Sequence, residues 1–299
     1  MASVHPAWDS YKERGTPAMI RLLVWCALFF GRTLTRLGLW PVVLYFYFAN
    51  TAARRASQDY LRRVLDRRVT IFHVLRHFHT FATVSIDRVY LLARRERFVN
   101  IEARLPGDER RFFPDGRAYV LLVAHFGSFE ALRVPAMRAR DRRVSLVLDR
   151  TTGRVAMSLL EQLDPILAGG IIDASQRGPG LVLDIKQAVD AKHVVGMMGD
   201  RVRDDERAIE ASFLGGRVRV PAGPWIVASA LQVPVVLGFA MYIGGRYTRQ
   251  LELLAERIEV PRGRREEALR EWAQRYLDRL EVRVRQAPYN WFNFYDFWL

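Results

Sequence analysis

The chain has 299 residues, half of them hydrophobic, and a formal net charge of +14. A chain of this length and composition can build one large domain, with or without a small appendage, so general disorder is excluded as the default. The single cysteine, Cys26, excludes a disulfide framework. All but three of the 46 basic residues are arginines, whose guanidinium groups suit phosphate and carboxylate partners. The charge fits nucleic acid, anionic lipid or an acidic carrier protein, and it does not separate them.

Two apolar runs, Met19–Phe30 and Gly38–Ala49, dominate residues 1–50, with Arg32 and Arg36 between them. Each run is shorter than the about 20 residues that cross a bilayer. No secretory signal peptide with an apolar centre and a small-residue cleavage site is recognisable. The many aromatic residues of this region suit a lipid interface. We therefore expect residues 1–50 to form an apolar helical membrane anchor; the alternative is a buried helical hairpin packed on the domain.

The rest of the chain divides at about residue 116. Residues 51–115 read as a helical region, because apolar residues up to Arg97 recur near helical spacing. In residues 116–299, short apolar runs alternate with expected helices. The expected strands are Tyr119–Val123, Val144–Leu148, Val194–Met198 and Val233–Phe239, and the expected helices are Phe129–Arg140, Val155–Leu163, Leu181–Ala191 and Pro224–Leu231. This alternation predicts an α/β fold in which a central sheet is flanked by helices.

The end of the chain combines an amphipathic helix with an aromatic tail. Apolar residues from Leu269 to Leu280 follow i, i+3, i+4 spacing opposite a charged face, which predicts a helix packed on the sheet. The last stretch, Tyr289–Trp298, is too aromatic for a free tail. We expect it either to dock into the core or to touch a membrane interface.

The segment from Val120 to Glu130 is an apolar strand that leads His125 into a turn, with Glu130 five residues later. Strand ends are where α/β sheets place reactive groups. We expect Ser128 to cap the next helix and Gly127 to let the backbone fold, so that carboxylate and imidazole meet. An imidazole can take the proton of an attacking alcohol while a carboxylate fixes its tautomer. The pair is a candidate general base; on spacing alone, a satisfied histidine beside a helix cap is the more common arrangement.

This stretch resembles the lipid A biosynthesis acyltransferase family, the late lauroyl and myristoyl transferases, whose motif is a histidine, four residues, and an aspartate or glutamate. His125 and Glu130 match that motif. The similarity covers roughly Ile20 to the C-terminus. It continues in the same order through Gly199–Arg201, Phe213–Gly216, Pro221–Pro224 and Pro234–Val236. The run Arg55–Leu61 and the aromatic ending resemble the branch of the family associated with aryl polyene lipids.

The resemblance implies a glycerolipid acyltransferase-like fold, with a seven-stranded mixed sheet and helices on both sides. It also implies transfer of a fatty acyl group from an acyl carrier protein or acyl coenzyme A thioester to a hydroxyl of a lipid or glycolipid. His125 would be the base and Glu130 its partner, with no covalent intermediate and no cofactor. The implied location is the cytoplasmic face of a bacterial inner membrane, against anionic lipid. The family commonly has glutamine where this chain has Arg201, so the acceptor stays open.

Three further polar residues, Arg150, Arg177 and Asp200, follow expected strands or open a helix. If the strands are parallel, all three lie along one edge of the sheet. An arginine there is a candidate for steadying the thioester oxyanion or gripping an acceptor phosphate, and Asp200 for orienting such an arginine. We predict that the three residues bind substrate; the alternative is a set of salt bridges that close the loop ends.

Other function classes have weaker signals. His73, His77 and His79 suggest a metal site, but no carboxylate or cysteine completes it, and no metal is predicted. The sequence has no Gly-x-Ser-x-Gly elbow, phosphate-binding loop or recognised nucleic-acid motif, so we expect neither a nucleotide cofactor nor nucleic acid. The competing function is a non-catalytic membrane adaptor of the same fold that binds anionic lipid or a carrier protein.

Overall fold

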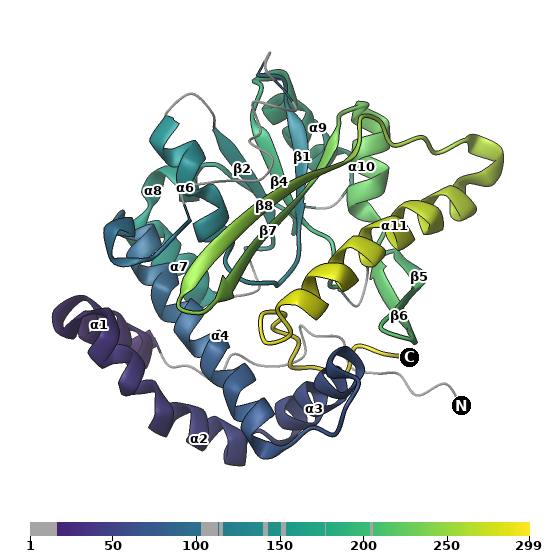
Figure 1. Ribbon diagram of the computed structural model, residues 1–299. Helices are drawn as coiled ribbons and strands as arrows, with labels where there is room; N and C mark the ends of the chain where they lie inside the picture. Colours follow the sequence, from purple (N-terminus) through teal and green to yellow (C-terminus); the bar gives the residue numbers. More distant parts are fainter. Residues whose placement is uncertain are drawn as a thin grey trace.

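The computed structural model describes residues 17–102, 113, 116–139, 143–150, 154–176, 178–203 and 206–299. Its helices are α1 (Pro17–Leu37), α2 (Leu39–Ala49), α3 (Thr51–Leu65), α4 (Ile71–Leu92), α6 (Phe129–Ala139), α7 (Arg154–Leu163), α8 (Pro165–Gly169), α9 (Pro179–Asp190), α10 (Gly223–Leu231) and α11 (Arg265–Gln286) (Figure 1). Its strands are β1 (Tyr119–Val123), β2 (Val144–Leu148), β3 (Ile171–Asp173), β4 (Val194–Met198), β5 (Ala208–Phe213), β6 (Gly216–Pro221), β7 (Val235–Ile243) and β8 (Arg246–Ala255). Short 3-10 turns lie at Glu96–Phe98 and Arg262–Arg264.

A mixed six-stranded sheet forms the centre, with the order β3-β2-β4-β1-β7-β8, and β5 and β6 form a separate hairpin. Strand β1 runs parallel to β4 and β7, and β2 runs parallel to β3 and β4. The last strand, β8, is antiparallel to β7. The α/β class with a mixed sheet flanked by helices is therefore confirmed. In the described part of the chain, however, this sheet has six strands rather than the seven that the resemblance implied.

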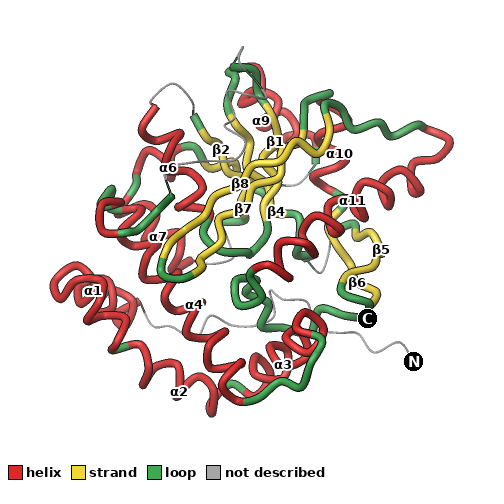
Figure 2. Tube along the Cα trace, viewed as in Figure 1, coloured by secondary structure: helices red, strands yellow, loops and turns green. Residues whose placement is uncertain are grey.

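Both faces of the sheet are covered, and the alternation of β1 shows how. Tyr119, Leu121 and Val123 belong to the apolar cluster that includes residues of α4 and α6, whereas Val120 and Leu122 belong to the cluster that includes α9, α10 and α11. Figure 2 shows the strands between these two sets of helices. Because successive side chains point to opposite faces, a strand buried on both sides is apolar throughout, and β1 is entirely buried.

Of the strands that sequence reasoning found, β1, β4 and most of β7 are buried on both sides, and β2 is partly buried. The predicted bounds of β1, β2 and β4 agree with the structure, and β7 begins two residues later than expected and continues to Ile243. The strands it missed include β5, β6 and β8, whose burial alternates or is only partial. The region 51–97 is mostly helical, as expected, and consists of α3 and α4, since Asp66 ends α3 in a left-handed conformation.

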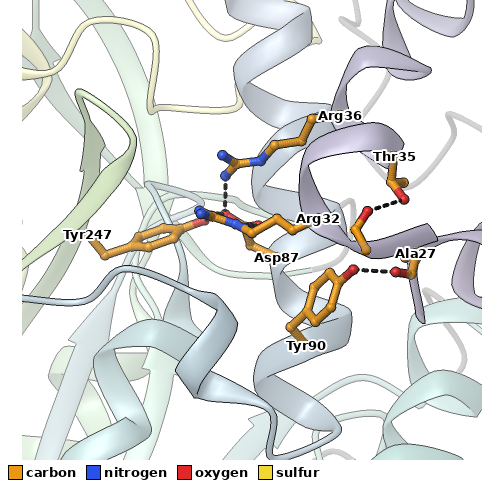
Figure 3. A network of polar contacts seen from close by, with 8 residues as sticks. Ala27, Arg32, Thr35, Arg36, Asp87, Tyr90 and Tyr247 are labelled. Atoms are coloured by element: carbon orange, nitrogen blue, oxygen red, sulfur yellow. Dashed lines mark hydrogen bonds and ion pairs between the residues drawn. The ribbon is translucent and has the colours of Figure 1, made fainter. Parts of the chain in front are cut away.

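Helices α1 and α2 lie along the outer side of α4 (Figure 1). Their attachment is polar: the Arg32 guanidinium donates to both oxygens of Asp87 on α4 at 2.8 and 2.9 Å, and Arg36 donates to the same carboxylate at 2.6 Å. The Tyr247 hydroxyl completes the cluster at 2.9 Å. Figure 3 shows both arginines turned inward onto Asp87, which is fully buried.

Because the arginines face the protein, the large apolar side chains of α1 and α2 are left on the outside. We call this set the apolar face; it consists of Trp25, Phe29, Phe30, Leu34, Leu37, Trp40, Leu44, Tyr45 and Phe48, all of which are exposed. In the described part of the chain, no helix combines the length and the hydrophobicity needed to cross a membrane. The expectation of a membrane anchor is therefore left without support, and α1 and α2 form a pair of surface helices packed on α4. The alternative of a buried hairpin holds only for the side that touches α4.

The aromatic tail docks into the core rather than lying free. Trp291 and Trp298 are 1% and 6% exposed. Trp298 bridges to Val218 of β6, and its indole donates to the Phe213 carbonyl at 2.9 Å. The tail therefore closes the end of the sheet near β1.

Candidate active site

The loop between β1 and α6 carries His125 and has the expected strand–turn–helix form. The Ser128 hydroxyl accepts a hydrogen bond from the Ala131 amide at 3.1 Å, which confirms the helix cap, and Glu130 lies in the first turn of α6. Gly127 has φ +64°, and a Cβ there would lie 1.7 Å from the Ala240 carbonyl oxygen. Only glycine fits between this loop and β7.

His125 pairs with Asp200. The imidazole Nδ1 lies 2.9 Å from one carboxylate oxygen of Asp200, and the backbone amide of His125 donates to the other at 3.0 Å. The pairing follows from the sheet, because β1 and β4 are parallel neighbours with Val123 opposite Met198. Each residue of the pair comes two positions after its strand ends. The two loops therefore emerge side by side at the carboxyl edge, where α/β sheets place their sites.

The electrostatics of the pair fix its protonation. Burial alone would raise the pKa of Asp200, but the charge and hydrogen bonds of His125, together with Arg201, lower that pKa to about 2. A carboxylate ionised at neutral pH only accepts hydrogen bonds, so Nδ1 must carry the proton and Nε2 the lone pair. Burial and the charge of Arg201 lower the pKa of His125, although Asp200 opposes them. The imidazole is thus neutral at pH 7, as a general base requires.

Glu130 has a different role from the one that its spacing suggested. Its carboxylate is 93% buried and accepts from Arg88 of α4 at 2.6 Å and from Ser128 at 3.3 Å. We expected Glu130 to orient His125, but the carboxylate that faces Nδ1 of His125 is that of Asp200. The cause is local: the first turn of α6 presents Glu130 toward the neighbouring α4, whereas Nδ1 faces β4.

The structure describes two of the three predicted substrate-binding residues, and these two lie in different places along the sheet edge. Asp200 and Arg150 both lie at the carboxyl edge of the parallel strands, as expected, and Arg177 lies outside the described residues. Asp200 orients the histidine rather than an arginine. Arg150 follows β2, two strands away from β1, where its backbone amide donates to Asp173 at 3.3 Å. It lines an open hollow of about 520 Å³ whose lining includes neither His125 nor Asp200.

Sequence reasoning missed three residues of the site: Arg88, Arg201 and Trp291. The positive charges of Arg88 and Arg201 both lower the pKa of His125, which places them around the imidazole. The Trp291 indole donates to Asp200 at 3.1 Å. Only the aromatic composition of the tail pointed toward Trp291, and nothing distinguished Arg88 from the many other arginines.

A small, mostly apolar pocket adjoins Glu130 and Arg88. Its remaining lining comes from the ends of β1, β2 and β4 and from α6, α7 and α8; it is Val123, Phe129, Leu146, Val147, Leu148, Leu160, Leu167, Gly196, Met197 and Met198. The pocket therefore extends from the polar edge of the site into the hydrophobic layer under the sheet.

The three histidines of α4 have separate surroundings. His73 accepts from the Thr70 amide in a capping box, and His79 stacks on Trp40. His77 lies between the Ser57 hydroxyl and the Trp291 carbonyl, and burial lowers its pKa to about 4. Within the described ranges, no group of three potential metal ligands occurs.

A scan against protein-family models finds no match to the chain, and a search of curated proteins finds none either. The function is therefore argued from the geometry of the site.

Proposed function

We propose that this protein is an acyltransferase that moves a fatty acyl group from a thioester donor, acyl carrier protein or acyl coenzyme A, onto a hydroxyl of a lipid or glycolipid. One observation carries the proposal: a neutral histidine, oriented by an ionised aspartate, lies at the carboxyl edge of the sheet, two residues after Val123, which lines an apolar pocket. The family resemblance of the His125–Glu130 segment supports the same chemistry.

The chemistry needs no protein nucleophile. Nε2 of His125 takes the proton of the acceptor hydroxyl while the oxygen attacks the thioester carbonyl. Asp200 stabilises the imidazolium that forms. When the tetrahedral intermediate collapses, the carbon–sulfur bond breaks and the imidazolium returns its proton to the departing thiolate. The products are an ester and a free thiol.

The negative charge on the carbonyl oxygen needs a cationic partner. The amides of Gly127 and Ser128 do not serve as an oxyanion hole, because they already donate to the carbonyls of Asn290 and Ala240 at 2.8 and 3.1 Å. Arg88 and Arg201 supply positive charge around His125 instead. The ion pair between Glu130 and Arg88 then acts as a support that holds Arg88 at the mouth of the pocket.

The apolar pocket beside this ion pair is the proposed site for the beginning of the acyl chain. Its walls are leucine, valine and methionine side chains, which match a hydrocarbon and leave no buried polar group to satisfy. The thioester carbonyl would then lie at the polar mouth, next to Glu130.

The apolar face of α1 and α2 is the proposed contact with the membrane. Its aromatic side chains suit the headgroup boundary, and a chain with a net charge of +14 favours anionic lipid. The adjacent Phe81 of α4 is 44% exposed and packs on Phe292, whose amide donates to the His125 carbonyl. Apolar surface therefore reaches from the proposed interface to the histidine. The proposed location is the cytoplasmic face of a bacterial inner membrane.

The test is mass spectrometry of total lipids from cells that lack the protein, complemented with wild type, His125→Ala or His193→Ala. His193 precedes β4 at the opposite edge of the sheet and bonds Ser145, so it controls for the loss of any histidine. We expect one acylated lipid to disappear in the deletion strain and to return with wild type and His193→Ala only.

The competing adaptor function predicts otherwise. If His125→Ala restores the lipid as well as wild type does, the catalytic assignment is wrong and a non-catalytic membrane adaptor explains the apolar face. If no lipid differs between the strains, the acyltransferase proposal is also rejected.

A further inference from the structure

The tail segment Asn290–Phe292 contacts the loops that follow β1 and β4, and also the end of strand β7. After β1, the Gly127 amide donates to the Asn290 carbonyl at 2.8 Å, and the Phe292 amide donates to the His125 carbonyl at 2.9 Å. After β4, Arg201 donates to the Phe292 carbonyl at 2.8 Å. The histidine loop is thus held on one side by a segment that is 165 residues away in the chain from His125 to Asn290.

Asn290 also fixes the end of β7. Its side-chain oxygen accepts from the Tyr242 amide at 2.6 Å, and its side-chain nitrogen donates to the Tyr242 carbonyl at 3.0 Å. Asn290 is 3% exposed. A side chain that pairs with both groups of one backbone residue locks the segment in register with the sheet.

The contact that matters for chemistry is made by Trp291. Its indole Nε1 donates to Asp200 at 3.1 Å, to the same oxygen that accepts from the His125 amide. The other oxygen faces Nδ1 of His125. Three donors therefore hold the carboxylate in the plane that directs it at the imidazole, and two of them belong to His125 itself. Among the described residues, Trp291 is the hydrogen-bond donor that holds the carboxylate from outside the pair.

Trp291 is itself held firmly. Its ring packs on Tyr60, Phe213 and Phe297 with centroid distances of 5.0, 5.2 and 4.9 Å. Its carbonyl lies 2.9 Å from Nε2 of His77. Since the pKa of His77 is lowered to about 4, that nitrogen donates as a neutral imidazole and Nδ1 accepts from Ser57.

We propose that Trp291 is a positioning residue that sets the geometry and basicity of the His125–Asp200 pair, so that the C-terminal tail is a working part of the active site. This inference rests on the proposed function. Its physical basis is that a hydrogen bond to the carboxylate withdraws negative charge from the oxygen, and so weakens the stabilisation that Asp200 gives to the imidazolium. Removing that donor makes His125 more basic and frees the carboxylate to rotate.

A substitution at Trp291 leaves the other titratable and charged groups around the pair chemically unchanged. They are Arg88 on α4, Arg201 after β4, Tyr276 on α11 and Tyr295 in the tail. A change in the pKa of His125 can therefore be assigned to the lost indole donor, provided that a second variant controls for the loss of packing.

Trp298 is the matched control. It lies in the same aromatic cluster, 6.1 Å from Trp291, is also buried, and also loses an indole hydrogen bond on substitution, to the Phe213 carbonyl. In the described part of the chain, the Trp298 indole donates to the Phe213 carbonyl, whereas the Trp291 indole donates to Asp200. Trp291→Phe and Trp298→Phe thus remove similar packing, and only the first removes the donor to the carboxylate.

The experiment measures the pH dependence with which diethyl pyrocarbonate modifies His125 in the full chain, followed by peptide mass spectrometry. We expect Trp291→Phe to raise the pKa of His125 relative to wild type, and Trp298→Phe to leave it unchanged. In the complementation assay, Trp291→Phe should lower the acylated lipid more than Trp298→Phe. Circular dichroism melting of both variants checks that the fold is retained.

Two outcomes overturn the proposal. One is a pKa of His125 in Trp291→Phe equal to that in Trp298→Phe; the other is an equal loss of lipid in both variants, which assigns Trp291 to packing alone. Because the modification rate needs no substrate, this result is separable from the proposed function. If the pKa moves but His125→Ala still restores the lipid, the acyltransferase proposal fails while the contact stands.

Discussion

Replacing Asp200 by asparagine is the sharpest test of which carboxylate serves His125. The carboxylate accepts from three donors: the His125 amide, Nδ1 of His125 and the Trp291 indole. Asparagine has one oxygen and one NH2 group, so it keeps all three hydrogen bonds only in one orientation. The amide oxygen then accepts from the His125 backbone and Trp291, and the NH2 group donates to Nδ1.

That orientation forces the wrong tautomer on the histidine. If Nδ1 accepts, the proton of the neutral ring moves to Nε2, which then has no lone pair for the acceptor hydroxyl. We expect Asp200→Asn to fold normally, because its hydrogen bonds are retained, and to lose most of the general-base contribution. That contribution is worth about 10²–10⁴ in kcat, or about 3–5 kcal/mol of transition-state stabilisation.

Glu130→Gln is the comparison. The glutamine oxygen can still accept from Arg88, while its NH2 group faces the Ser128 hydroxyl, which can accept from it instead of donating; the charge of the ion pair is lost and the local contacts are kept. We expect a loss in kcat of no more than about tenfold. The assay is the initial rate of acylated lipid formation from an acyl thioester and a total lipid extract, followed by mass spectrometry. If Asp200→Asn stays near the wild-type rate while Glu130→Gln falls by orders of magnitude, the orienting role returns to Glu130 and our reasoning is wrong.

Three further predictions follow from the buried groups. Because the pKa of His125 is lowered from 6.5, kcat/KM should rise with pH through an acid limb centred below pH 6.5; an acid limb centred above pH 7 would contradict a neutral base. Burial lowers the pKa of His77 from 6.5 to about 4, so the stability tied to its neutral form is present above pH 6.5 and is lost as the pH falls toward 4. In chemical denaturation, wild type should therefore lose about 2–3 kcal/mol more than His77→Gln between pH 7.5 and pH 4.5, and equal losses would contradict this assignment. Gly127→Ala should lower the free energy of unfolding by at least about 2 kcal/mol, since its Cβ would overlap the Ala240 carbonyl, whereas Gly263→Ala, which meets nothing within 4 Å, should cost far less. Equal thermal shifts in the two glycine variants would show that the loop can move.

The first half of the site was readable from the sequence because its geometry is local. An apolar strand, a glycine, a capping serine and a helix follow one another between Val120 and Glu130, and each step depends only on near neighbours. The same locality explains why β1, β2 and β4 were found with their bounds. Strands buried on both faces leave continuous apolar runs, whereas the half-exposed β5, β6 and β8 do not.

The N-terminal helices show where pattern reasoning stopped short. The sequence identified apolar runs with Arg32 and Arg36 between them, but it carried no sign of which way these arginines point. Their partner, Asp87, lies more than 50 residues away on α4 and is fully buried. Because two arginines face a buried carboxylate, most of the aromatic residues of α1 and α2 lie on the outer side, while Tyr47 is buried.

The sequence by itself determined the α/β alternation, the placement of His125 at a strand end, the cap at Ser128 and the need for a small residue at Gly127. The tertiary structure decided the partner of the histidine. Asp200 meets His125 because β4 pairs with β1 in register, and Trp291 meets Asp200 because the tail docks against the same edge. Both contacts join residues at least 75 positions apart, and pairing over such distances is set by strand order and by the burial of the tail, which no local pattern records.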